Sequence, residues 1–185
     1  MAYFYFDFRD IGKQTRCDLL HSLLIQLSAR SNTFCKILST LYKAHDDGVR
    51  QPSDNALMQC LKDMLTLPDQ CPIYLIVDAL DECPDSAGVP PARKLVLDLV
   101  KELVDLRLSN LRICLTSRPE IDIEDTLKPL TSHVVSLHDE IGQKHDIAHY
   151  IRSVVYSDSG KLMRRWKIED KELAIQMLSE GANGM

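Results

Sequence analysis

Short uninterrupted apolar runs and longer periodic stretches divide this chain into two kinds of segment. The runs lie at residues 3–8, 73–77, 111–115 and 134–137, and each has the length and the β-branched or aromatic content of a strand. Because the first run, YFYFDF, is apolar almost throughout, we expect it to be a strand buried on both faces. The run at 134–137 predicts the last strand of the sheet.

Between and after these runs, apolar residues recur every three or four positions, as they do on one face of an amphipathic helix. Strands that alternate with helices indicate an α/β fold with a parallel sheet, and the last two helices indicate a helical tail after about residue 140. The spacing predicts helices over residues 14–30, 34–41, 54–65, 92–106, 143–155 and 170–180.

Composition and charge narrow the classes of function. The chain has 185 residues, of which 45% are hydrophobic, and this suits one ordinary globular domain. Its formal charge of -5 and its lack of any Lys/Arg block argue against nucleic-acid binding. No stretch approaches the roughly 20 apolar residues of a membrane span. The acidic N-terminus is unlike a secretory signal, so we predict a cytosolic or nuclear protein and favour the cytoplasm.

Three acids follow the most apolar of the predicted strands. Asp78 ends the run IYLIV, and Asp81 and Glu82 lie in the turn that follows. Nucleoside triphosphate hydrolysis needs such a group, because one acid can hold Mg²⁺ through its water shell while another orients or deprotonates the attacking water. The alternative is that the three acids solvate a strand-to-helix turn, and this motif alone does not decide between the two interpretations.

A second polar motif follows the strand predicted at 111–115. It reads TSRP and places Arg118 at the same edge of the sheet as the three acids. Arginine is planar, permanently charged and able to bind a phosphate through two N–H groups, so Arg118 is a candidate sensor of a γ-phosphate. The alternative is an ion pair with a local carboxylate such as Glu120.

In order and spacing, the segments YFYFDFRD, IYLIVDALDEC, LRICLTSRPE and HDIAHYI resemble the NACHT domain of STAND-class P-loop NTPases. The likeness is to fungal incompatibility-type and nephrocystin-like members, which often carry ankyrin or WD repeats. It implies that Asp78 is the Walker B magnesium ligand, that Asp81 and Glu82 activate water, and that Arg118 is the sensor. It also implies Mg²⁺ with ATP or GTP as cofactors, and a molecular switch that forms homo-oligomers on activation.

The resemblance further implies a partial nucleotide-binding domain over residues 1–140 and the start of a helical extension over 141–185. In the family, a glycine-rich phosphate-binding loop and its strand precede the YFYFDF strand, and that missing strand is central to the sheet. The motif G-x-x-x-x-G-K-[ST] does not occur in this chain.

The segment Gly12-Lys13-Gln14-Thr15 fails as a phosphate loop, since Thr15 is one place late and Asp7 takes the place of the first glycine. We therefore expect a fragment of a signalling NTPase that is inactive by itself. The alternative is a non-catalytic NACHT-derived remnant or interaction scaffold.

Overall fold

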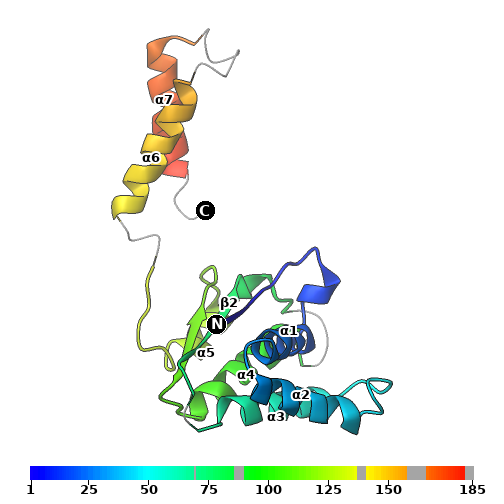
Figure 1. Cartoon of the computed structure of the whole chain (residues 1–185). Helices are drawn as coiled ribbons and strands as arrows, with labels where there is room; N and C mark the ends of the chain where they lie inside the picture. Colours follow the sequence, from blue (N-terminus) through cyan, green and yellow to red (C-terminus); the bar gives the residue numbers. More distant parts are fainter. Residues whose placement is uncertain (69, 86–89, 137–140, 158–165, 182–185) are drawn as a thin grey trace. The chain divides into compact units, whose positions relative to one another are not determined.

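The computed structural model describes residues 1–68, 70–85, 90–136, 141–157 and 166–181 (Figure 1). The chain divides into two compact units, Met1–Thr131 and Ser132–Met185, and each is considered by itself. It stays a prediction that residues 1–140 form a nucleotide-binding domain and that residues 141–185 begin a helical extension.

The first unit is built on a parallel sheet of three strands in the order β1-β2-β3. Residue Tyr5 lies opposite Asp78 in the first pair of strands, and Val77 lies opposite Leu115 in the second. The carboxyl ends of all three strands therefore meet at one edge of the sheet. The predicted α/β class and parallel sheet are confirmed, with strands β1 (Ala2–Tyr5), β2 (Ile73–Asp78) and β3 (Leu111–Leu115).

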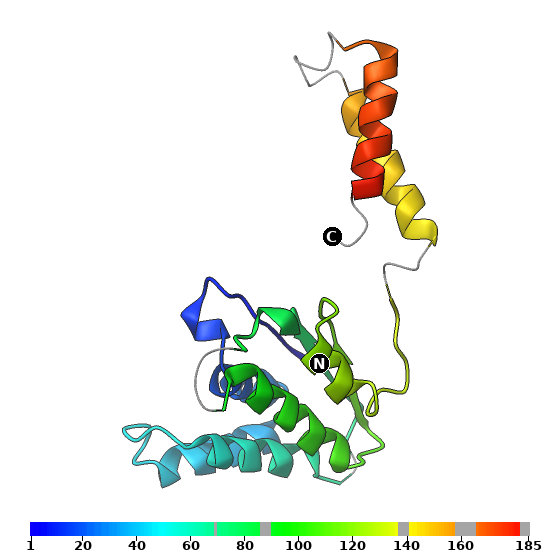
Figure 2. The same ribbon diagram turned by 180° about the vertical axis from the view of Figure 1, so that it is seen from behind.

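The α-helices that the structure describes in this unit gather on one side of the sheet (Figures 1 and 2). Helix α1 packs against β1 and against α2, α3 and α4. Polar caps begin several helices, as the sequence pattern suggests. Thr15 forms a capping box with Asp18 at α1, and Ser53 caps α3. The helices are α1 (Arg16–Ser28), α2 (Asn32–Ala44), α3 (Asp54–Leu65), α4 (Ala92–Asp105) and α5 (Ile121–Leu127).

The hydrophobic core lies between the sheet and these helices. Alternate strand residues, such as Leu75 and Val77, meet buried leucines of α1, α3 and α4. Full burial of one such side chain contributes about 1.5–3 kcal/mol relative to exposure. The core therefore holds β2, and with it the turn that carries the acids, in a fixed place.

The opposite face of the sheet is exposed, and the prediction that YFYFDF is buried on both faces is wrong. The exposed fractions of Tyr3, Tyr5 and Tyr74 are 55%, 45% and 51%. The described helices of this unit cover one face alone, so the strand residues alternate between buried and exposed positions. The first strand is also shorter than predicted, because pairing with β2 ends near Tyr5 and the chain turns into a loop.

The strand predicted at 134–137 is not formed. Residues 134–136 have no regular structure, and Leu137 lies outside the described residues. Val134 and Val135 are exposed, and no neighbouring strand is paired with them in the part of the chain that the structure describes. An apolar run needs a partner strand to satisfy its backbone groups, and sequence periodicity does not supply one.

The second unit is a pair of helices, α6 (Ile141–Val155) and α7 (Ile168–Gly181), which pack against each other. A polar cluster joins them: Glu172 on α7 accepts hydrogen bonds from Arg152 at 2.6 Å and from the Tyr156 hydroxyl at 2.8 Å. Within the described ranges, every helix of the protein is too short or too polar to traverse a lipid bilayer.

Candidate functional site

Asp78 is the last residue of β2, and it is held by the neighbouring strand end. The Thr116 hydroxyl donates a hydrogen bond to the Asp78 carboxylate and accepts one from the Ala79 N–H at 3.1 Å. The Thr116 carbonyl also accepts from the Leu80 N–H at 3.0 Å. Residue Thr116, which follows β3, thus fixes both the carboxylate and the turn behind it.

The turn after Asp78 has an unusual backbone. Ala79 adopts the left-handed conformation, with φ 54° and ψ 47°. This conformation is unfavourable for a residue with a Cβ atom. It lets the chain turn directly into a short 3-10 helix, η2 (Leu80–Glu82), whose first residue is fully buried. Asp81 and Glu82 are therefore carried on a short, anchored segment.

The two predicted motifs are in direct contact. The Asp81 carboxylate accepts a hydrogen bond from the Arg118 N–H at 3.0 Å and lies 3.6 Å from the Arg118 Nε. The side chain of Arg118 is 77% exposed, whereas that of Asp81 is only 10% exposed. The arginine thus pairs with an acid of the β2 turn, and not with Glu120, which was the local partner considered above.

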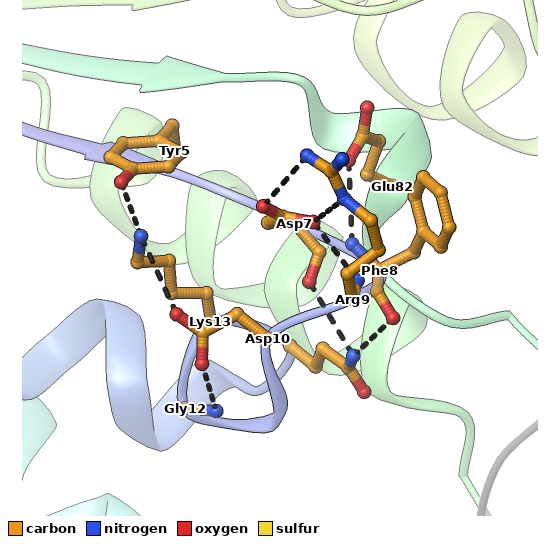
Figure 3. A network of polar contacts seen from close by, with 9 residues as sticks. Tyr5, Asp7, Phe8, Arg9, Asp10, Gly12, Lys13 and Glu82 are labelled. Atoms are coloured by element: carbon orange, nitrogen blue, oxygen red, sulfur yellow. Dashed lines mark hydrogen bonds and ion pairs between the residues drawn. The ribbon is translucent and has the colours of Figure 1, made fainter.

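Glu82 connects the turn to the loop that follows β1. Its carboxylate accepts a hydrogen bond from the Phe8 N–H at 3.3 Å (Figure 3). Three of the predicted site residues, Asp81, Glu82 and Arg118, line an open pocket of about 350 Å³. Phe8 and Glu120 also line this pocket, whereas Asp78 does not.

Arg93 is a site residue that the sequence analysis did not single out. It lies in the first turn of α4 and is only 7% exposed. Its guanidinium group donates to the carbonyl of Asp81 at 2.6 Å and to the carbonyl of Cys83 at 2.9 Å. One signal could have revealed it: residues 93, 96, 97 and 100 share the i, i+3, i+4, i+7 row, so an arginine stands on the apolar stripe of the helix.

Several polar groups of the loop after β1 bond to one another, as Figure 3 shows. The Asp7 carboxylate accepts from the Arg9 N–H at 2.9 Å and from the Arg9 Nε at 3.1 Å. These hydrogen bonds hold the pKa of Asp7 below its ordinary value. Lys13 contacts the Tyr5 hydroxyl and the Asp10 carboxylate, and the contact with Tyr5 is the main cause that raises the pKa of Lys13.

The same loop contains the segment Gly12-Lys13-Gln14-Thr15, whose glycine and lysine resemble a phosphate loop. The Gly12 N–H donates to the Asp10 carboxylate at 3.0 Å, so an internal acid takes this backbone donor. The Thr15 hydroxyl donates to Asp18 at 2.6 Å as part of the cap of α1. The groups that could bind a phosphate are therefore engaged within the loop.

Asp78 is the acid of this sheet edge that could hold a metal ion, because its carboxylate is exposed at the end of β2. Among the described residues, no group of three or more His, Cys, Asp or Glu side chains could hold a metal ion. Mg²⁺ in nucleotide sites takes one or two carboxylates and completes its shell with water and phosphate oxygens. An exposed carboxylate at a strand end, as Asp78 is, meets that requirement.

A comparison with protein families identifies the chain. The family model described as Nephrocystin 3, N-terminal matches residues 1–118. The chain belongs to this family. The nephrocystin-like part of the predicted resemblance is thereby confirmed, and the nephrocystin 3 N-terminal match includes Asp78, Asp81, Glu82 and Arg118. A comparison with curated proteins and one with solved structures found no match.

Proposed function

We propose that this nephrocystin 3 N-terminal chain carries the acidic part of the nucleotide site of a NACHT-type signalling NTPase. In this proposal Asp78 binds Mg²⁺ through water, Asp81 and Glu82 orient or deprotonate the attacking water, and Arg118 senses the γ-phosphate. The nucleotide is ATP or GTP. The parent protein is a switch in the cytoplasm that forms homo-oligomers when the triphosphate is bound.

One observation carries the proposal: the ends of two adjacent parallel strands bring the two motifs into contact. Arg118 follows β3, Asp81 follows β2, and the carboxylate of Asp81 accepts the N–H of Arg118 at 3.0 Å. In open α/β sheets, ligands bind outside the carboxyl ends of the strands. The pocket of about 350 Å³ beside Asp81, Glu82 and Arg118 lies at that edge.

The charges of the site suit a triphosphate bound with its magnesium ion. Acids alone would repel the phosphate oxygens, so Mg²⁺ and an arginine are needed to balance the charge. Arg118 is exposed and lines the pocket together with Glu82, and Asp78 is an exposed carboxylate at the end of β2. The chain's residues would thus orient water and the γ-phosphate, and the bound Mg²⁺ would supply the positive charge next to them.

The test is nucleotide hydrolysis by the protein isolated from its own cells, with substitutions introduced at the native locus. We expect Asp78→Asn and Glu82→Gln each to lower the Mg²⁺-dependent rate by about 100-fold or more. We expect Arg118→Ala to lower it by about 1,000-fold. Asp125→Asn, an exposed acid of α5, is the matched control and should leave the rate unchanged. Equal rates in wild type and in all three site variants would refute the proposal.

A second function is favoured by the local partners of the same acids. Asp78 is bonded to Thr116, Asp81 to Arg118, and Glu82 to the Phe8 N–H. A turn held in this way also suits a non-catalytic scaffold that contacts related proteins. The scaffold predicts no affinity of the 185-residue chain for a fluorescent ATP or GTP analogue with Mg²⁺. Micromolar binding that Asp78→Asn abolishes would exclude it.

A further inference from the structure

Arg93 is one of two charged side chains in the buried core of the described residues, together with Arg16. Each of its guanidinium nitrogens has a partner. The Nη2 donates to the Asp81 carbonyl at 2.6 Å and the Nε to the Cys83 carbonyl at 2.9 Å. The Nη1 lies 3.4 Å from the Asp122 carboxylate and 3.8 Å from that of Asp85.

These partners belong to two segments that meet at the site. The carbonyls of Asp81 and Cys83 lie in and just after η2, whereas Asp122 lies in α5, four residues after Arg118. One side chain of α4 therefore ties the acidic turn to the segment that follows the sensor arginine. Arg93 itself does not contact the carboxylates of Asp81 or Glu82 in the described structure.

We propose that Arg93 is a positioning residue that holds Asp81 and Glu82 in register with Arg118. That this positioning serves catalysis rests on the proposed function. That Arg93 positions the turn rests on its contacts alone. The left-handed residue Ala79 disfavours the turn, so the turn needs fixed contacts on its far side. The carbonyls of Asp81 and Cys83 have no other hydrogen-bond donor among the described residues.

An arginine is the residue type that this position requires. The Nη2, Nε and Nη1 of Arg93 each reach a different partner, and the planar fork of a guanidinium group can bond to all of these partners at once. A lysine keeps the charge near Asp122 but has a single nitrogen to share between two carbonyls. We therefore expect Arg93→Lys to retain part of the positioning and Arg93→Ala to lose it.

The experiment uses two backbone amides that report on the two acids. The Arg118 N–H donates to the Asp81 carboxylate and the Phe8 N–H donates to that of Glu82, so their exchange rates measure the position of these side chains. NMR amide exchange on the 185-residue chain should show at least about tenfold faster exchange of both amides in Arg93→Ala. Arg93→Lys should give a smaller increase.

Two controls separate positioning from general destabilisation. The Val77 amide in the centre of the sheet should exchange at the wild-type rate, and Lys94→Ala, an exposed neighbour, should change none of the three amides. Ethylguanidinium added to Arg93→Ala should restore slow exchange, because it can fill the place of the lost group. A purely structural arginine would change Val77 together with the other amides.

Unchanged exchange of the Phe8 and Arg118 amides in Arg93→Ala would overturn the inference. If that variant does not fold, Arg93→Lys decides in its place: wild-type exchange at both amides would count against positioning, and faster exchange at these two amides alone would support it. No nucleotide is present in this experiment. A failure of the proposed NTPase activity would therefore leave the positioning result intact, and the two outcomes can be told apart.

Discussion

Replacement of Ala79 by glycine should stabilise the protein, although glycine usually weakens a fold. Ala79 has φ 54°, a value that places its Cβ close to the neighbouring backbone. Glycine has no Cβ and adopts this conformation freely. The hydrogen bonds from the Ala79 and Leu80 N–H groups to Thr116 need no alanine side chain, so the turn itself should be preserved.

The expected magnitude is a difference between two opposing terms. The left-handed conformation costs an L-residue about 1–2 kcal/mol. The greater freedom of glycine in the unfolded chain costs about 0.5–1 kcal/mol. We therefore expect Ala79→Gly to raise the free energy of unfolding by about 0.5–1 kcal/mol, which corresponds to a rise in Tm of about 1–4 °C for a chain of this size.

The measurement is urea unfolding followed by pulsed alkylation of Cys83, a thiol that is fully buried in the same unit. Arg107 provides a matched control, because it has φ 50°, follows the C-cap residue of α4 and lies away from the acids. Arg107→Gly should give a similar gain. If Ala79→Gly lowers stability by about 1 kcal/mol while Arg107→Gly raises it, strain at the acidic turn is refuted.

Three further predictions concern the framework of the site. Glu102→Gln should lower stability by about 1 kcal/mol in urea melts, because the Glu102 carboxylate lies 3.0 Å from Lys62 and 3.8 Å from the nearly buried Arg16. Gln26→Leu should lower it by about 1–2 kcal/mol, because the Gln26 amide exchanges two hydrogen bonds with the outer edge of β1. Burial raises the pKa of Cys83 from 9.0 to about 12. The folded state then holds a proton that the unfolded state releases, so stability should fall between pH 9 and 12 and Cys83→Ala should reduce that fall.

Much of the fold was predictable because its elements carry strong local signals. The apolar runs at 73–77 and 111–115 correspond closely to β2 and β3, and the periodic segment at 54–65 corresponds to α3. Each of these elements buries one face or its whole length in the core, and this burial leaves a periodic or continuous apolar pattern in the sequence. Caps such as Ser53 mark their starts.

The errors concern properties that depend on neighbours distant in sequence. The run YFYFDF has no polar alternation, yet Tyr3 and Tyr5 are exposed, because tyrosine tolerates water at its hydroxyl and no described helix covers that face. The run at 134–137 has the composition of a strand, but composition does not create a partner for its backbone. The short helix α5 was not predicted, because a segment of seven residues carries too little periodicity.

In the candidate site, the residues at the strand ends could be predicted from the sequence, whereas the residue that supports them could not. Asp78 and Arg118 could be placed at one edge, because parallel strands deliver their carboxyl ends together. The contact between Asp81 and Arg118 follows from that placement. The support by Arg93 could not be predicted in this way. Arg93 lies on α4 and bonds to backbone carbonyls, which every residue has and which therefore leave no signal in the sequence.

The structure thus locates the fixed part of the acidic turn in its backbone. The Thr116 contacts hold Ala79 and Leu80 from the β3 side, and Arg93 holds the carbonyls of Asp81 and Cys83 from the α4 side. The carboxylates of Asp81 and Glu82 accept the backbone N–H groups of Arg118 and Phe8, which belong to other segments. In the proposed site, a ligand that competes for these carboxylates would have to displace the two N–H groups, while the contacts of Thr116 and Arg93 with the turn backbone would remain.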